Sequence, residues 1–382
     1  MNSGDEITIE ATELVAGGDA LARVEGFPIF TANVFPGDVA VVRLVEVKKG
    51  FARADLVRIG KPSPWRRASP CPVSEECGGC DWTALRLDRQ LEAKKRILSE
   101  SLRRIGKFDV ASLPPIDVHA SPLNYRIRSR LHRQGDAVGF YAMRSNRVVP
   151  LPAECEVVGC ETAKHFGGGQ APSPVRTAEG GCPPLTIWEL DDRLITSDEE
   201  LTIRVDDYTY QLSTRSFFQV NRHLLTTMLR LVSSHADRVR SRDVALDLYS
   251  GVGFFTAPLA DRFARVSAIE GAPESARYGR RNAARNVAVV EAAVEQQVRN
   301  FPNADFIFLD PPRAGARQEV IRAAGEQARE MVCYLSCDPV TFARDANRLT
   351  ASGWRLSTLD LLDLFPNTHH VETLASFERA ET

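Results

Sequence analysis

The chain has 382 residues, 43% of them hydrophobic and 26% charged, and a formal net charge of −2. This composition is typical of a globular protein with more than one core, and it provides no overall basic field for nucleic acid. The first residues, MNSGDEITIE, lack the apolar segment of a secretory signal, and no apolar run is long enough to span a membrane. We therefore expect a cytoplasmic protein, in which eight cysteines suit metal binding or catalysis better than disulfides.

The first sixty residues are predicted to form a small β-barrel of the oligonucleotide-binding type. Short segments rich in Val, Ile and Phe alternate with turn sequences such as AGGDA and FPGD. The last strands carry the basic residues Lys48, Lys49, Arg53, Arg58 and Lys61. These residues fit either an RNA-binding surface or an ordinary solvated face.

A cysteine motif, CPVSEECGGCDW, follows the barrel. Its cysteines are Cys71, Cys77 and Cys80, and the Gly78–Gly79 pair lets the backbone wrap closely around a bound group. Structural zinc sites more often use two C-x2-C pairs, whereas three clustered thiolates with a distant fourth suit a 4Fe–4S cluster. Cys155 is the expected fourth ligand, and Cys160 is the alternative.

A helix is predicted from about Trp82 to Ile105, followed by a β-rich region. In YRIRSRLHR the period of a strand puts Arg126, Arg128 and Arg130 on one face. Three guanidinium groups on one face favour RNA phosphate as a partner, with a plain charged surface as the alternative. The Gly/Pro-rich stretch 167–184 is predicted to be a loop.

From about Leu212 onward, buried strands alternate with helices, which predicts an α/β domain with a doubly wound parallel sheet. Ligands of such sheets lie beyond the carboxyl ends of the strands. Asp310, Cys337 and the turn at Gly251 each follow a predicted strand, so we expect them at one edge of the sheet.

The turn in LDLYSGVGFF has the pattern of a cofactor-binding loop. Gly251 and Gly253 follow a strand and precede a helix, and Glu270 ends the next strand, where a carboxylate can bind ribose hydroxyls. The third glycine of a dinucleotide fingerprint is missing. S-adenosylmethionine therefore fits better than NAD, although a lone G-x-G is weak and Glu270 is alternatively an ordinary acid at a strand end.

The motifs FLDPPRAG and LSCDPVTFARD indicate chemistry at uracil C5. C5 is a poor nucleophile, but a thiolate that adds to C6 makes C5 reactive toward a sulfonium methyl group, after which a base must remove the C5 proton. Cys337 is the candidate nucleophile and Glu372 the candidate base. A buried structural thiol and a surface acid are the alternatives, and Cys333 is expected to be structural.

Together these motifs resemble the RNA (uracil-5-)-methyltransferases, specifically the iron–sulfur type that acts on 23S ribosomal RNA. SFFQVN, DLYSGVGFF, DPPRAG, LSCDPVTFARD and DLFPNTHHVET occur in the family's order. The resemblance implies Cys337 as nucleophile and Glu372 as base. It implies S-adenosylmethionine contacts from Gln219, Tyr249, Glu270 and Asp310, with Gly251 and Gly253 shaping the pocket. It implies a 4Fe–4S cluster on Cys71, Cys77, Cys80 and Cys155.

Three domains are expected from this resemblance: a TRAM-like barrel at 1–60 that binds RNA, a central domain at 61–211 that holds the cluster, and a methyltransferase domain at 212–382. Three positions depart from the family pattern. Asp338 replaces the usual Asn and is expected to raise the pKa of Cys337 by repulsion, Phe254 stands where an Asn is frequent, and Glu295 is the candidate for an acid after the third strand.

The expected activity is methylation of C5 in a uridine flipped out of folded RNA, which the barrel and the arginine strand would hold. No membrane and no obligate protein partner are inferred. A tRNA uridine is the alternative substrate. A non-catalytic RNA-binding or assembly factor is the alternative class, and an amino-methyltransferase would leave Cys337 without a role.

Overall fold

The computed structural model describes residues 1–167, 184–191 and 193–380, and the chain divides into two compact units. Unit 1 comprises Met1–Ile97, Ser129–Ile187 and Phe365–His370. Unit 2 comprises Leu98–Arg128, Trp188–Leu364 and Val371–Thr382. The predicted loop at 167–184 lies outside the described residues except for its two ends. The division into three domains stays a prediction.

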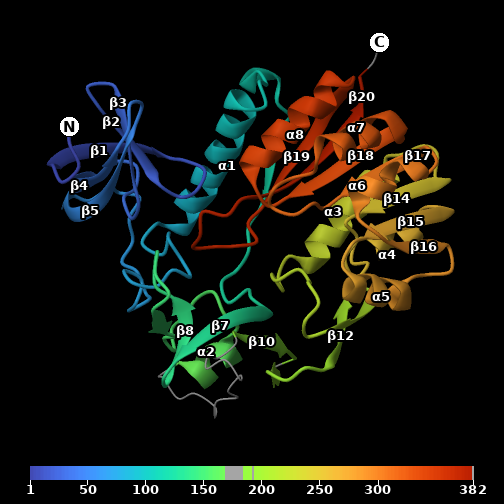
Figure 1. Cartoon of the computed structure of the whole chain (residues 1–382), viewed down its shortest axis with the longest axis horizontal. Helices are drawn as coiled ribbons and strands as arrows, with labels where there is room; N and C mark the ends of the chain where they lie inside the picture. Colours follow the sequence, from blue (N-terminus) through green and yellow to red (C-terminus); the bar gives the residue numbers. More distant parts are fainter. Residues whose placement is uncertain (168–183, 192, 381–382) are drawn as a thin grey trace. The chain divides into compact units, whose positions relative to one another are not determined.

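Unit 1 begins with a closed five-stranded barrel in the order β1-β2-β3-β5-β4, drawn in blue in Figure 1. The strands are β1 (Glu6–Leu14), β2 (Ala20–Val24), β3 (Phe27–Thr31), β4 (Val39–Val47) and β5 (Ala52–Lys61). Every second residue of β4 from Ala40 to Leu44 is buried, as expected when one face of a strand points into a barrel. The predicted barrel is confirmed.

The rest of unit 1 is built around an antiparallel meander. β8 (Ala137–Tyr141) pairs with β9 (Val148–Pro150) on one side and with the end of β7 (Arg128–Gln134) on the other. The short helix α2 (Cys160–Phe166) follows. The long helix α1 (Leu87–Arg104) starts in this unit.

Unit 2 contains an eight-stranded sheet in the order β16-β15-β14-β17-β18-β20-β19-β6. Its strands are β6 (Ile116–His119), β14 (Val244–Leu248), β15 (Arg265–Glu270), β16 (Val287–Glu291), β17 (Ala304–Leu309), β18 (Ala328–Ser336), β19 (Trp354–Leu362) and β20 (Glu372–Arg379). β14 to β18 run parallel, and β14 and β17 are buried along their whole length. This sheet confirms the predicted α/β fold class.

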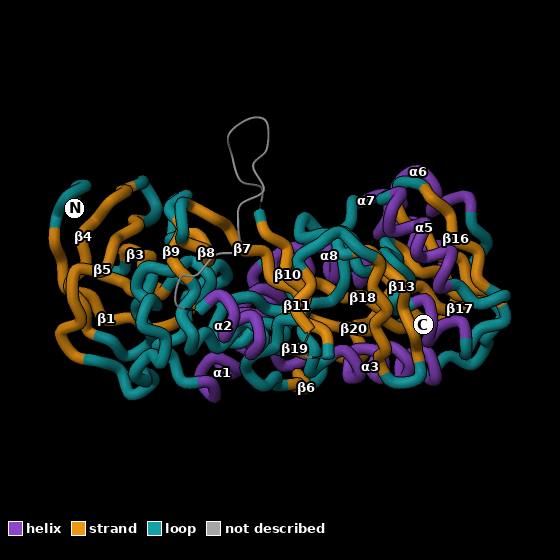
Figure 2. The backbone as a smooth tube through the Cα atoms, turned by 90° about the horizontal axis from the view of Figure 1, so that it is seen from below, coloured by secondary structure: helices purple, strands orange, loops and turns teal. Residues whose placement is uncertain are grey.

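Helices precede or connect the parallel strands of unit 2 and pack on the sheet (Figures 1 and 2). They are α3 (Leu225–Asp237), α4 (Thr256–Ala260), α5 (Pro273–Asn282), α6 (Val294–Gln297), α7 (Gln318–Gln327) and α8 (Pro339–Ala351). α4 and α5 connect strands on one side of β14, whereas α7 connects β17 to β18 on the other. Right-handed crossovers therefore put these two groups on opposite faces. The hairpin of β12 (Glu200–Val205) with β13 (Tyr208–Ser213) completes the unit, and β10 (Leu185–Leu190), whose first three residues belong to unit 1, pairs with β11 (Arg193–Ile195).

Three element predictions were wrong in detail. β2 was not predicted, because its sequence ALARV is rich in alanine, a weak strand former. The predicted helix from Trp82 begins only at Leu87, because the backbone at 85–86 pairs with residues 65–66 instead. The segment PESARYGRRNAARN is predicted to be one helix, but α5 ends at Asn282, whose side-chain amide donates to two backbone carbonyls outside the helix. Within the described residues, no helix is long and apolar enough to cross a bilayer.

Candidate active site

The strand order of the unit 2 sheet reverses between β14 and β17. The chain runs from β14 outward to β15 and β16, then returns to β17 and continues outward to β18. Such a reversal leaves an opening beyond the carboxyl ends of the two central strands, where ligands of open α/β sheets bind. β14 leads into the segment Tyr249–Gly253 and β17 leads into Asp310.

The glycine turn after β14 is held by a carboxylate from β15. Gly251 and Gly253 have φ values of 56° and 89°, which glycine adopts without a steric cost. The Glu270 carboxylate accepts the backbone N–H of Gly251 at 2.8 Å and that of Ala272 at 2.6 Å. Glu270 thus fixes the turn that faces the opening.

Tyr249 has a positive φ of 65°, which is uncommon for a residue with a side chain. Its hydroxyl donates to the Glu295 carboxylate at 3.0 Å. Glu295, at the start of α6, is thus held beside the turn after β14, and its role as the acid after the third strand stays a prediction. Phe254 is buried among Tyr210, Phe218 and Phe255, so its side chain belongs to the core.

Carboxylates gather at the strand reversal. Burial, followed by the charges of Asp247 and Glu270, raises the pKa of Asp310 to about 8. Burial also raises the pKa of Asp247 to about 7, against the lowering effect of the Thr256 hydroxyl that donates to it. Gln219 donates from Nε2 to Asp310 Oδ2 at 3.3 Å. Asp247, which the sequence interpretation left out, therefore belongs to the same acidic group as Asp310 and Glu270.

Cys337 and Glu372 are brought together by an antiparallel strand that the sequence did not predict. β20 pairs with β18 in a register that joins Leu335 to Leu374 and Ser336 to Thr373. One further step along this register puts Cys337 opposite Glu372. Glu372 is only 5% exposed, so it is not the surface acid considered as the alternative.

The thiol and the carboxyl group share their electrostatic surroundings. Burial, then the charges of Glu372 and Asp310, raises the pKa of Cys337 to about 12. Burial and Asp310 raise the pKa of Glu372 well above its usual value. The Arg313 guanidinium lowers both pKa values. The sequence analysis did not identify Arg313 as a site residue, although it is the basic residue of the motif DPPRAG.

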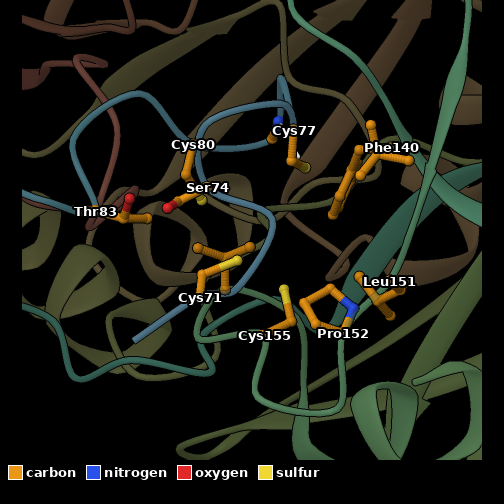
Figure 3. A pocket seen from close by; sticks show the side chains of 12 residues that line it. Cys71, Ser74, Cys77, Cys80, Thr83, Phe140, Leu151, Pro152 and Cys155 are labelled. Atoms are coloured by element: carbon orange, nitrogen blue, oxygen red, sulfur yellow. Dashed lines mark hydrogen bonds between the residues drawn. The ribbon is translucent and has the colours of Figure 1, made fainter. Parts of the chain in front are cut away.

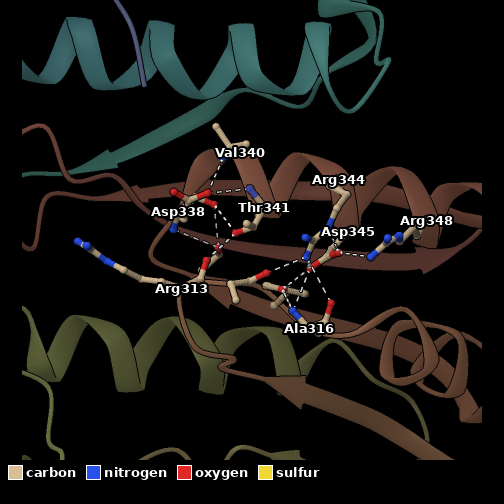
Figure 4. Close-up of polar contacts among 11 residues, drawn as sticks. Arg313, Ala316, Asp338, Val340, Thr341, Arg344, Asp345 and Arg348 are labelled. Atoms are coloured by element: carbon tan, nitrogen blue, oxygen red, sulfur yellow. Dashed lines mark hydrogen bonds and ion pairs between the residues drawn. The ribbon is translucent and has the colours of Figure 1, made fainter. Parts of the chain in front are cut away.

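Asp338 has a different role from the one predicted. Its carboxylate accepts the backbone N–H groups of Val340 at 3.0 Å and Thr341 at 2.7 Å and thus caps α8 (Figure 4). The carboxylates that chiefly raise the pKa of Cys337 are those of Glu372 and Asp310. An aspartate therefore serves here as a helix cap beside the thiol.

In unit 1, Cys71, Cys77, Cys80 and Cys155 line one pocket (Figure 3). Aliphatic and aromatic groups, including Phe140 and Leu151, complete its wall. Burial, then the neighbouring Cys155, raises the pKa of Cys71. Cys155 is buried in this pocket, whereas Cys160 is exposed at the start of α2.

The two glycines of the cysteine motif lie against β8. A Cβ atom on Gly78 would lie 2.8 Å from the carbonyl oxygen of Tyr141, and one on Gly79 would lie 2.9 Å from the Phe140 ring. A side chain at either position would collide with β8, so the two glycines let the cysteine motif pack against this strand. Close wrapping around a bound group stays a prediction. Among the described residues, no three His, Cys, Asp or Glu side chains are arranged to hold a metal ion.

The arginine strand has the expected alternation. Arg126, Arg128 and Arg130 alternate with Ile127, Ser129 and Leu131, which are all buried. Arg128 donates to the carbonyl oxygen of Ser216 at 3.2 Å and stacks on Trp188, while Arg130 is exposed. Binding of RNA phosphate by this face stays a prediction.

Comparison with known proteins gives matches along nearly the whole chain. A family model described as tRNA (uracil-5-)-methyltransferase matches residues 190–296 and 296–380, and a TRAM domain model matches residues 2–57. An uncharacterized RNA methyltransferase of Gloeobacter violaceus is 30% identical, over 99% of this chain and 97% of its own. The 23S rRNA (uracil(1939)-C(5))-methyltransferase RlmD of Edwardsiella ictaluri is 31% identical, over 98% of this chain and 96% of its own.

A solved structure shares the fold. The tRNA (uracil-54, C5)-methyltransferase of Pyrococcus abyssi, in complex with S-adenosyl-L-homocysteine, superimposes with a TM-score of 0.69 at 24% identity. The match covers 97% of this chain and 99% of that protein. At this identity, the match shows that the two proteins share a fold.

Proposed function

The chain belongs to the tRNA (uracil-5-)-methyltransferase family, whose members methylate uridine C5 in RNA with S-adenosylmethionine, and we propose that its substrate is a uridine of 23S ribosomal RNA. The proposed chemistry at uracil C5 rests on the pairing of β18 with β20, whose register brings Cys337 next to Glu372. The 23S rRNA methyltransferase RlmD, at 31% identity over nearly the whole chain, supports ribosomal RNA as the substrate class.

The acidic group at the strand reversal suits S-adenosylmethionine, which carries a sulfonium and an ammonium group. In addition to burial, the charges of Asp247 and Glu270 raise the pKa of Asp310, and that of Glu270 raises the pKa of Asp247, so a bound cation would relieve this repulsion. Gln219, Tyr249, Glu270 and Asp310 are the residues that would hold this cofactor, and the Gly251 and Gly253 turn would let it approach the backbone. When bound, it supplies an electrophilic methyl group.

Cys337 acts as the nucleophile in the proposed reaction. Its thiolate forms a bond to C6 of the uracil ring, and the electron pair of the C5–C6 double bond moves so that C5 can take the methyl group. Glu372 then removes the proton from C5, the C5–C6 double bond forms again, and the bond between sulfur and C6 breaks. The raised pKa of Glu372 suits a group that must hold a proton during turnover.

The cysteine-lined pocket suits an iron–sulfur cluster in its donor chemistry. Four thiols and mainly apolar groups surround it, and thiolates are the ligands that iron–sulfur clusters use. Cys71, Cys77, Cys80 and Cys155 would hold a 4Fe–4S cluster, and its role would be to organise this part of unit 1.

RNA recognition is assigned to the TRAM barrel and to the arginine face of β7. Both would contact RNA phosphates and recognise the shape of the folded RNA. Such contacts fix the position of the RNA without reading every base. The target uridine must leave its stack, because the thiol has to reach the face of the ring at C6.

Two experiments test this function. Ribosomal RNA from a strain that lacks the protein should have one or more unmodified uridines in place of 5-methyluridine. 23S RNA containing 5-fluorouridine should form a stable covalent adduct with the enzyme, because fluorine cannot leave as a proton does. A missing modification in tRNA with intact 23S RNA would favour the second candidate, a tRNA uridine, which the printed family description supports. Absence of an adduct with both 23S RNA and tRNA that contain 5-fluorouridine would favour a non-catalytic RNA-binding factor.

A further inference from the structure

A buried carboxylate in α8 joins three parts of unit 2. Asp345 has a fully buried side chain, and its oxygens accept hydrogen bonds from Tyr334 Oη at 2.9 Å and the backbone N–H of Ala316 at 3.1 Å (Figure 4). Arg344 donates to it from Nε at 2.9 Å and from Nη2 at 3.0 Å, and Arg348 donates at 3.0 Å. Five donors therefore converge on one carboxylate.

The same contacts fix the loop that follows β17. Arg344 donates to the carbonyl oxygens of Ala314 at 3.1 Å and Ala316 at 3.3 Å, and Thr341 Oγ1 donates to that of Arg313 at 3.2 Å. Three backbone carbonyls within residues 313–316 of the Asp-Pro-Pro loop are thus bound to the first turns of α8. We call these contacts the Asp345 network, consisting of residues 313–316, Tyr334, Thr341, Arg344, Asp345 and Arg348.

Gly315 shows how closely the loop lies on the helix. Its φ is 73°, and a Cβ atom there would lie 2.6 Å from Asp345 Oδ2 and 3.0 Å from Thr341 Cβ. A side chain at this position would push the loop away from α8 and would also strain the backbone.

Both ends of the network lead to reacting groups. The loop begins at Asp310 and carries Arg313, and α8 begins two residues after Cys337, with Asp338 as its N-cap. We propose that Asp345 is a positioning residue that fixes the Asp310 and Arg313 side of the site relative to the Cys337 thiol during adduct formation. This proposal depends on the proposed role of Cys337 as nucleophile.

The physical reason is the steep cost of a misplaced reacting group. Shifts of about 1 Å cost on the order of 10²-fold in rate when the reacting groups must be aligned. Asp310 and Arg313 act on Cys337 with opposite charges. Movement of the loop would change the balance of these two charges at the sulfur atom. It would also change how the sulfur atom approaches the uracil ring.

The test compares Asp345→Asn with a matched control, Asp305→Asn. Asp305 is also fully buried and accepts two backbone N–H groups and an arginine, but it lies at the amino end of β17, opposite to Asp310. The measurement is the rate of adduct formation with 5-fluorouridine 23S RNA at saturating RNA and cofactor. The final amount of adduct measures the fraction of enzyme that is folded, and the rate constant measures how well the reacting groups are aligned.

We expect D345N to lower the rate constant by about 10- to 100-fold, with the cofactor Kd changed less than the rate. D305N should lower only the final amount of adduct. Thr341→Val removes one contact of the network without a buried charge, so it folds, and it should lower the rate by a smaller factor. G315A should lower the rate like D345N, and the double variant G315A/D345N should be no slower than either single variant, because both disrupt the same contact.

Equal rate constants for the wild type, D345N and T341V would overturn the proposal, as would full additivity of G315A and D345N. A wild-type enzyme that forms no adduct would instead overturn the proposed function, so the two failures are distinct.

Discussion

The two units of the molecule surround their cysteines with opposite kinds of neighbours. In unit 1, four cysteines line a pocket whose other walls are mainly apolar, with Phe140 and Leu151 among them. In unit 2, Cys337 lies at a strand end beside two carboxylates, Glu372 and Asp310, and one guanidinium, Arg313. The first environment suits thiolates that are neutralised by a metal, and the second suits a thiol that gains and loses a proton during turnover.

Cys333, the other cysteine of unit 2, shows that burial alone does not decide function. Cys333 is fully buried in the middle of β18, four residues before Cys337, and faces the sheet core. Burial raises the pKa of Cys333 well above that of a free thiol. Burial also raises the pKa of Cys337, but that side chain is partly exposed and is next to Glu372. Exposure and a neighbouring base therefore separate a candidate nucleophile from a structural thiol.

The strongest test of this contrast is Cys337→Ser. A hydroxyl is a far weaker nucleophile than a thiolate, so methylation should fall by about 10⁴-fold or more, and adduct with 5-fluorouridine RNA should disappear. Cys333→Ala is the control. It should cost about 1 kcal/mol of stability and leave the adduct unchanged. Turnover by C337S near the wild-type rate would contradict the assignment of the nucleophile.

The next largest effect is expected for Glu372→Gln. The amide has nearly the same shape but cannot remove the C5 proton, so turnover should fall by about 10²- to 10⁴-fold. With unmodified RNA and cofactor, a methylated protein–RNA adduct should accumulate and be visible as a slow band on a denaturing gel. Rapid release of methylated RNA from E372Q would show that another group is the base.

The pocket of unit 1 predicts a different outcome for a cysteine substitution. Cys155→Ala should lower the iron content of anaerobically purified protein from about four atoms per chain and remove the visible absorbance of the cluster. The thermal midpoint should fall by more than about 5 °C, because metal binding contributes to folding stability. Cys160→Ala is the matched control and should keep both properties. Iron loss in C160A but not in C155A would exchange the two assignments.

The sequence predicted the parts of the site that depend on local pattern. Alternating strands and helices identified the parallel sheet, and the rule that ligands lie at strand ends grouped the Gly251 turn, Asp310 and Cys337 correctly at one edge. The cysteine spacing likewise anticipated a shared location for Cys71, Cys77 and Cys80. These features follow from residues that are close in the chain.

Long-range pairing was beyond such reasoning. Cys337 and Glu372 lie close together because β20 pairs antiparallel with β18 in the sheet. No local sequence pattern specifies this pairing. The Asp345 network was missed because its donors come from three elements and are satisfied only in the folded chain. An isolated carboxylate in a helix sequence gives no sign of burial.

The smallest expected effect concerns the charges around the nucleophile. Asp310 raises the pKa of Cys337, so Asp310→Asn should lower that pKa and increase the thiolate fraction at a given pH. Because the pKa of Asp310 is itself about 8, its charge is mostly absent at pH 7 and mostly present at pH 9. Alkylation of Cys337 by iodoacetamide, followed by mass spectrometry, should therefore be similar in the two proteins at pH 7 and several-fold faster in D310N at pH 9, by about tenfold for each unit of pKa. The difference should vanish as the pH approaches about 12, where the wild-type thiol ionises as well.

Cys160 provides the internal reference for this measurement. It is exposed in unit 1, so its alkylation rate should be the same in D310N and in the wild type. S-adenosylmethionine, as a cation bound near Asp310, should have the same effect on wild-type Cys337 as the substitution has. Slower alkylation of Cys337 in D310N would mean that the loss of the Gln219 contact outweighs the removed charge, and the electrostatic account of the thiol would then be wrong.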